Sequence, residues 1–173
     1  MRLLMELDMK NYAPDAPVVV RPSVRGIVIR RGRVAMVCNR KYGYYTFPGG
    51  GIEAGETPEA ALMREMAEET GLTLLRESIR PYGRVHSVQK GMLGDTFVQD
   101  NDYYLCSVGE GIAPTRLEAY ETEAGYTLVF VAPEEAVTQN LRAVAGGDDP
   151  IGEALVRRDN HVLKLLVEEG YFT

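Results

Sequence analysis

Residues 50–72 read GGIEAGETPEAALMREMAEETGL, a stretch in which glycines flank a run with helical spacing. Thr57 is a good N-cap, and Pro58 suits the first helical position because its missing N–H needs no partner there. Gly71 suits the left-handed residue that often ends a helix. The stretch therefore predicts a helix that begins at Pro58 and ends before Gly71.

At about 100° per residue, this helix has an apolar face and a charged face. The apolar face contains Ala60, Leu62, Met63, Met66 and Ala67, and the charged face contains Arg64, Glu65, Glu68 and Glu69. Glu65, Glu68 and Glu69 stand at i, i+3 and i+4, where helical side chains are neighbours. Three like charges so placed repel one another, which a solvated surface helix tolerates. An ordinary amphipathic helix is thus the simplest interpretation of these glutamates alone.

The wider spacing argues against that simple interpretation. The pattern also fixes Gly50, Glu56 and Gly71 at set distances from the charged face. Chance agreement at all these positions is on the order of 10⁻⁹ for any given start. Converging carboxylates are the hard oxygen ligands that Mg²⁺ takes together with substrate phosphates. Residues 50–72, called the box below, therefore indicate a metal-dependent phosphate site.

The box resembles the signature of the Nudix hydrolases and departs from it at no fixed position. Upstream, residues 45–51 (YTFPGGG) are similar to the aromatic-x-x-Pro-Gly-Gly segment that precedes the box in that family. Downstream, the run 128–131 followed by 133–136 is similar to the late strand and following helix of the family. The resemblance implies an α/β fold, a Nudix-type α/β/α sandwich with a mixed sheet between helices.

The resemblance also implies a reaction, namely hydrolysis of a phosphoanhydride in a nucleoside diphosphate linked to another moiety. Metal-activated water would be the nucleophile, with Mg²⁺, or Mn²⁺ in its place, as the metal. The implied metal ligands are Glu65, Glu69, Glu68 and the carbonyl of Gly50. Glu68 has two possible roles, as a further ligand or as the base that orients the water. The implied catalytic residues are Glu65, Glu68 and Arg64.

Arg64 cannot bind a cation, but its planar fork suits a carboxylate. We therefore expect Arg64 to orient a glutamate of the box, and Glu56 is the first candidate.

Four further residues are candidates for substrate binding. Arg40 and Lys41 could meet phosphates, although a solvated basic pair is an equal alternative. Tyr44 could stack on a base or shape the site, although half-buried packing is the more usual role of such a tyrosine. Glu121 lies with two other glutamates in an expected loop before the late strand, a region from which several family members supply an additional acid.

The substrate itself is not defined by the sequence. Residues 87–90 carry neither the proline typical of ADP-ribose enzymes nor the tyrosine typical of dinucleoside polyphosphate enzymes. Nucleoside triphosphates and nucleotide sugars remain open. A different class also remains, a non-catalytic nucleotide-binding sensor on the same fold, although such modules usually lose box glutamates and this chain has lost none.

Length and composition favour one domain over residues 1–173, with 1–20 as an N-terminal strand or arm. The apolar content is 45%, and the net charge of −6 argues against binding to nucleic-acid polymers, which needs a basic face. The expected partner is a small nucleotide, with no membrane partner, and a homodimer is left open. Because no signal segment or spanning run of apolar residues is seen, we expect a cytoplasmic protein.

Hydrophobic patterning predicts the remaining elements. Residues 40–51 are expected to form a loop, and 146–150 a turn. Strands are expected at 24–29, 34–38, 73–82, 85–88, 97–108 and 126–131, and further helices at 134–140 and 160–169. The first two strands are expected to form a hairpin with its turn at 30–33, and the strands at 85–88 and 97–108 are expected to form an antiparallel pair.

Overall fold

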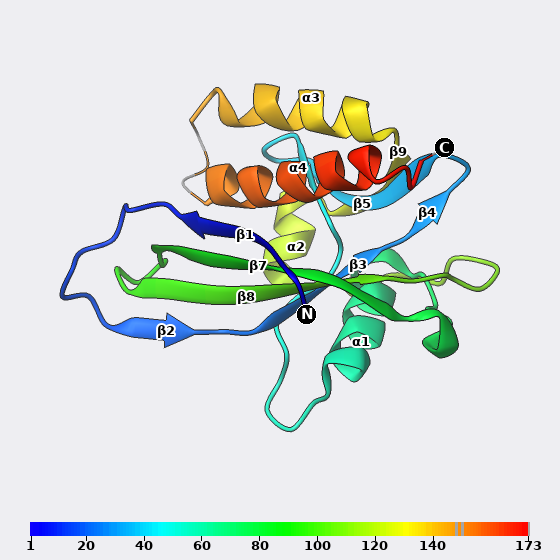
Figure 1. Ribbon diagram of the computed structural model, residues 1–173, viewed down its shortest axis with the longest axis horizontal. Coiled ribbons are helices and arrows are strands. Elements are labelled where there is room, and N and C mark those ends of the chain that lie inside the picture. The colour runs from blue at the N-terminus through cyan, green and yellow to red at the C-terminus, as the bar shows by residue number, and fades with distance from the viewer. Residues whose placement is uncertain (148, 150, 173) are drawn as a thin grey trace.

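The computed structural model describes residues 1–147, 149 and 151–172. It arranges them in three layers (Figure 1), with β-sheet in the middle, helix α1 (Pro58–Thr70) on one side, and helices α3 (Pro133–Val144) and α4 (Gly152–Glu168) on the other. The α/β/α sandwich implied by the resemblance is confirmed.

The larger sheet is mixed, as expected. Its central pair is the antiparallel hairpin of β7 (Arg80–Lys90) and β8 (Thr96–Leu105). Three shorter strands run parallel to their neighbours in this sheet: β1 (Leu3–Asp8) pairs with β7, and both β2 (Val18–Val20) and β3 (Ser23–Ile27) pair with β8. The sheet is extended well beyond the helices at the β7–β8 turn (Figure 1).

The smaller sheet is antiparallel and is built around β5 (Arg33–Asn39). Its other strands are β4 (Ile29–Arg30), β6 (Tyr44–Thr46) and β9 (Thr127–Val131). The expected strand 24–29 is therefore divided, because the chain passes from the larger sheet to the smaller one at Val28. The expected hairpin between residues 24–29 and 34–38 is present as the β4–β5 pair.

Strand β3 lies between two hydrophobic cores, and its side chains alternate between them. Val24 packs against α1, whereas Ile27 packs on the side of α4. Gly26 lies against the sulfur of Met66 in α1, where a Cβ would come within 2.5 Å. The alternation therefore directs Arg25, the charged residue of this strand, away from α1 and toward α4.

Two expected loops contain regular structure. Residues 44–46 form β6, because Tyr44 and Thr46 are buried and pair with Asn39 and Val37 of β5. Residues 119–124 form a short helix, α2 (Ala119–Ala124), in place of the expected loop. Its first turn is closed by a capping box between Glu118 and Glu121, a local signal that outweighs the polar composition.

Two further boundaries were wrong. Residues 73–82 do not form one strand: Leu74 makes a single bridge to Val108, the 3₁₀ turn η1 (Arg76–Ser78) follows, and β7 then begins. The last helix begins at Gly152 and not at 160, because its first half buries Arg158 and Asp159, two charged residues that hide the amphipathic pattern. Of the expected turn at 146–150, residues 148 and 150 lie outside the described residues.

Among the described residues, no helix combines the length and the apolar character that a bilayer crossing requires.

Candidate functional site

Helix α1 begins and ends where the sequence predicts. The Oγ1 of Thr57 accepts a hydrogen bond from the N–H of Ala60 at 3.2 Å, and Pro58 occupies the first turn. Gly71 ends the helix with a φ of 71°. A Cβ on Gly71 would lie 1.9 Å from the carbonyl oxygen of Ala113, so this glycine is required both by conformation and by space. Both ends of the helix that carries the box glutamates are thus fixed.

Arg64 lies at the centre of the charged face and contacts residues of both the helix and the preceding loop. Its Nε and Nη2 each donate to a different carboxylate oxygen of Glu56, both at 2.9 Å. Its Nη1 donates to Glu65 at 2.7 Å and to Glu68 at 3.3 Å, and its Nη2 also reaches the carbonyl oxygen of Gly51 at 3.1 Å. The ion pair with Arg64 is the main reason that the pKa of Glu56 is lowered.

Glu69 was assigned to the charged face, but it stands seven residues after Leu62, at the border with the apolar face, and the structure buries it. Its side chain is buried, with 5% exposure, and its Oε2 accepts a hydrogen bond from the N–H of Gly49 at 2.8 Å. Burial raises the pKa of Glu69 to about 8, although the positive charge of Arg25 and the bond from Gly49 act in the opposite direction. Burial also raises the pKa of Glu65, against the lowering effect of Arg64.

Gly49, Gly50 and Gly51, called the glycine turn below, bring the backbone close to these carboxylates. Gly49 has a φ of 136°, and a Cβ there would lie 2.1 Å from the carbonyl oxygen of Val24. A Cβ on Gly50 would lie 2.6 Å from the carboxyl group of Glu65. The absence of side chains therefore lets the turn rest directly on the helix face.

The backbone of the glycine turn is paired with β3. The N–H of Gly26 donates to the carbonyl of Pro48 at 2.9 Å, and that of Val24 donates to the carbonyl of Gly50 at 3.0 Å. The Gly50 carbonyl, an expected metal ligand, thus already accepts one hydrogen bond, and a carbonyl oxygen has a second lone pair.

The donor set suits a hard cation, although it is not arranged around one here. Glu65, Glu68 and Glu69 offer oxygens only, as Mg²⁺ prefers, and a cation would relieve the crowding of their charges. Within the described part of the chain, no three His, Cys, Asp or Glu side chains converge in a geometry that could hold a metal ion as they stand. Each of the three carboxylates is bonded within the protein, Glu65 and Glu68 to Arg64 and Glu69 to the N–H of Gly49.

Three glutamates were expected in the segment before the late strand, and Glu121 is the one whose charge affects a glutamate of the box. It is buried in α2, where it accepts hydrogen bonds from the N–H of Glu118 at 2.7 Å and the hydroxyl of Tyr120 at 2.9 Å. Its charge is one of the causes that raise the pKa of Glu69. Glu123 is exposed and forms an ion pair with Lys41 at 2.8 Å.

The other candidates for substrate binding differ in their accessibility. Arg40 is exposed, and its aliphatic stem lies against Gly125. Tyr44 is buried, with 4% exposure, and its hydroxyl donates to Asp149 at 2.8 Å and accepts from Asn39 at 3.3 Å. The structure therefore leaves Arg40 open to a ligand, while the hydroxyl of Tyr44 has two protein partners.

Two arginines that the sequence interpretation did not select lie beside the glycine turn. The exposed Arg21 places its guanidinium against Gly51, where a Cβ would lie 2.2 Å from Nε. The Nη1 of Arg25 donates to the carbonyl of Gly49. The sequence feature that could have identified Arg25 is its position, because it is the one charged residue of strand β3.

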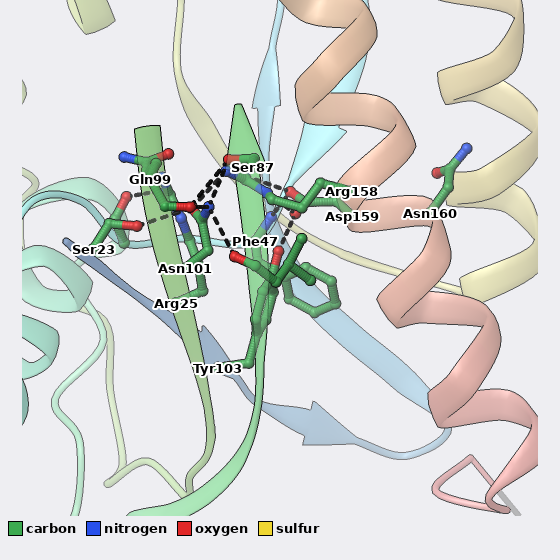
Figure 2. A network of polar contacts seen from close by, with 12 residues as sticks. Ser23, Arg25, Phe47, Ser87, Gln99, Asn101, Tyr103, Arg158, Asp159 and Asn160 are labelled. Atoms are coloured by element: carbon green, nitrogen blue, oxygen red, sulfur yellow. Dashed lines mark hydrogen bonds and ion pairs between the residues drawn. The ribbon is translucent and has the colours of Figure 1, made fainter. Parts of the chain in front are cut away.

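A buried polar network connects this region to α4 (Figure 2). Asp159 accepts hydrogen bonds from the N–H of Phe47 at 2.9 Å, the hydroxyl of Tyr103 at 2.6 Å and the Nε of Arg158 at 2.8 Å. Arg158 also donates to Asn101 at 2.8 Å. Because Phe47 stands two residues before Gly49, α4 anchors the segment that enters the glycine turn.

Comparison with solved structures agrees with this architecture. A NUDIX hydrolase from Nitrosomonas europaea superposes with a TM-score of 0.56 at 19% identity, over 83% of this chain and 90% of that one. A MutT NUDIX hydrolase from Burkholderia pseudomallei gives a TM-score of 0.51 at 23% identity, over 67% and 85%. At these identities the likeness concerns the fold.

Among curated proteins, the chain is similar to relatives named RNA pyrophosphohydrolase. That of Photobacterium profundum is 51% identical over 55 residues, and that of Yersinia enterocolitica is 50% identical over 54 residues. These matches cover about a third of each protein, 31% of both chains in the first case and 30% in the second. The model of the NUDIX domain, in contrast, matches residues 19–154, and the chain therefore belongs to the NUDIX family.

Proposed function

We propose that this protein is a metal-dependent pyrophosphohydrolase that cleaves a phosphoanhydride of a nucleotide derivative. The observation that carries the proposal is the packing of the glycine turn against α1, with Gly50 on the carboxyl group of Glu65 and Gly49 bonded to Glu69. This packing puts the backbone of the glycine turn against two of the expected carboxylate ligands. Membership of the NUDIX family supports the same reaction class.

In this proposal, Glu65, Glu69 and the second lone pair of the Gly50 carbonyl hold a divalent cation, Mg²⁺ or Mn²⁺. When bound, such a cation neutralises phosphate oxygens and acidifies a water molecule. Glu68 has the most exposed side chain of Glu65, Glu68 and Glu69, at 31%, and among the described residues the 3.3 Å ion pair with Arg64 is its only side-chain hydrogen bond or ion pair. It is therefore the box glutamate best placed to orient or deprotonate the water, or to complete the ligand set.

Arg64 and Glu56 act as positioning residues in this proposal. Arg64 holds Glu65 and Glu68 from the helix side, and the two-pronged pair with Glu56 fixes the guanidinium. Arg21 and Arg40, both exposed and without a carboxylate partner among the described residues, are available for substrate phosphates.

The names of the relatives add a substrate class that the acidic composition argued against. RNA pyrophosphohydrolases are named for RNA, so RNA with a 5′-diphosphate or 5′-triphosphate end stands beside small nucleotides as a candidate. The box would treat both alike, because the bond that is cleaved is a phosphoanhydride in each case.

A substrate panel with Mg²⁺ tests the proposal. We would incubate the protein with ADP-ribose, a nucleotide sugar, a dinucleoside polyphosphate, nucleoside triphosphates and a 5′-triphosphate RNA, and measure released phosphate, pyrophosphate and nucleoside monophosphate. Release from at least one substrate, lost on adding EDTA and in Glu68→Gln, is the expected result. No release from any substrate, combined with tight nucleotide binding by calorimetry, would instead support the non-catalytic sensor.

A further inference from the structure

Arg25 occupies an unfavourable position in the middle of β3. Its Nη1 donates to the carbonyl oxygen of Gly49, while its Nε is closed off from solvent and has no hydrogen-bond partner among the described residues. Arg158, an arginine whose side chain is buried, lies in the same group of polar side chains (Figure 2). The buried Nε–H of Arg25, unpaired within the described part of the chain, and the nearby positive charge of Arg158 both lower the stability of the folded state.

The charges around Arg25 act on its pKa in opposite directions. Burial lowers the pKa of Arg25 most strongly, and the charge of Arg158 lowers it further, whereas Asp159 and then Glu69 raise it. A long apolar side chain such as methionine would fill this position without either penalty. The stability of the fold therefore does not explain why a guanidinium stands here.

The contacts of Gly49 suggest another reason. Its N–H donates to Glu69 at 2.8 Å and its carbonyl oxygen accepts from Arg25, so both backbone polar groups of Gly49 are bonded to charged side chains. Gly49 can adopt its φ of 136° only as a glycine, and its neighbour Gly50 rests on the Glu65 carboxyl group. Movement of Gly49 would therefore displace the Gly50 carbonyl relative to Glu65.

We propose that Arg25 is a positioning residue for the reaction: it fixes the Gly49 carbonyl so that the glycine turn is held in register with Glu65 and Glu69. This inference rests on the proposed function, and it adds a residue that lies outside the box and in a different layer from α1. Arg25 touches neither substrate nor water in this role.

The main test is Arg25→Met, which keeps the length of the side chain and removes its donors. We expect kcat to fall about 10²-fold with KM nearly unchanged, because misplacement of a positioned group by about 1 Å has effects of that size on turnover. Arg84→Met is the matched control, since Arg84 is also a sheet arginine, on β7, but pairs with Asp100 and Asp102. Near-normal kcat in Arg25→Met would overturn the inference.

Chemical rescue distinguishes positioning from a general packing defect. Arg25→Ala should regain part of its kcat when guanidinium chloride is added well below the molar range that unfolds small proteins, and urea at the same concentration should not restore it. Equal effects of guanidinium and urea would contradict a specific bond to the Gly49 carbonyl. If either variant fails to fold, Arg25→Leu provides the measurement, since its side chain has no donor for the Gly49 carbonyl and a normal kcat would equally overturn the inference.

A measurement without substrate separates this inference from the proposed function. In Arg25→Met, hydrogen exchange at the Gly49 amide should speed up about tenfold or more, while the amides of β7 and β8 keep their protection. Unchanged exchange at Gly49 would refute the role of Arg25 and leave the proposed function standing. If the unaltered protein hydrolyses no substrate, the proposed function is refuted, and so is the effect of Arg25 on turnover.

Discussion

Arg64 and Glu56 are joined by two parallel hydrogen bonds, in which Nε and Nη2 each lie 2.9 Å from one carboxylate oxygen. The two side chains are only 25% and 15% exposed, so solvent screens the pair less than it screens a surface ion pair. A planar guanidinium matches a carboxylate in this two-pronged way, whereas an ammonium group cannot. The pair connects the loop before Thr57 to the middle of α1.

Arg64→Lys should therefore damage the protein although the charge is kept. We expect the free energy of unfolding to fall by about 1–2 kcal/mol, the range for charge-assisted hydrogen bonds, as measured by urea unfolding. Arg157→Lys is the matched control: its pair with Glu153 is more than half exposed on both sides, so its loss should matter by less than about 0.5 kcal/mol. Equal effects of the two substitutions would show that the fork of Arg64 has no special role.

Divalent metal should stabilise the protein against heat. Millimolar Mg²⁺ or Mn²⁺ should raise Tm, because a ligand that binds only the native state shifts the folding equilibrium by mass action. The double variant Glu65→Gln/Glu69→Gln should lose the metal-dependent part of this rise, measured by calorimetry with and without EDTA. A metal response that persists in the double variant would remove both residues from the ligand set.

The sequence was sufficient to predict α1 because the signals there are local. Thr57, Pro58 and Gly71 each act within one turn of the helix, and the predicted contact of Arg64 with Glu56 follows from short spacing and complementary shape. The strand pairs β7–β8 and β4–β5 were predicted for the same reason, since each joins neighbours in the sequence.

The sequence could not reveal features that depend on distant residues. Glu69 follows Leu62 by seven residues and Met66 by three, so its phase puts it at the edge of the apolar face, but the sequence could not show that its carboxylate is buried and bonded to the distant N–H of Gly49. Likewise, Arg158 and Asp159 interrupt an amphipathic pattern, and their burial makes sense only once Tyr103, Asn101 and Phe47 supply partners. Tertiary contacts of this kind override local propensity.

The stability of the metal-free protein should depend on pH through Glu69. Its pKa is raised to about 8 in the folded state, above its ordinary value, so the native state retains a proton that the unfolded chain loses. The stabilisation is complete below the unfolded pKa and is lost as pH rises toward about 8 and beyond. In EDTA, Glu69→Gln should therefore gain stability relative to the unaltered protein between pH 5 and 8, measured by urea unfolding. A constant difference across that range would contradict the raised pKa.

Glu68→Gln should separate catalysis from folding. The side chain of Glu68 is 31% exposed and makes one long ion pair, so the free energy of unfolding should change by less than about 1 kcal/mol. Turnover should fall about 10²-fold or more if Glu68 orients or deprotonates the water. Near-normal turnover would transfer this role to Glu65 or to Glu121.

Isotope labelling should locate the bond that is cleaved. If water attacks phosphorus beside Glu65 and Glu69, hydrolysis in ¹⁸O-labelled water places the label on a phosphoryl product and none on a sugar or base carbon. The product should also retain its nucleoside as a mono- or diphosphate, and mass spectrometry of the products measures both. Glycosidic cleavage would place the label on carbon, and it requires a pair of carboxylates flanking a sugar ring, a chemistry in which the Gly50 carbonyl and Arg64 have no part. Label on carbon would therefore contradict the proposed reaction whatever nucleotide is the substrate.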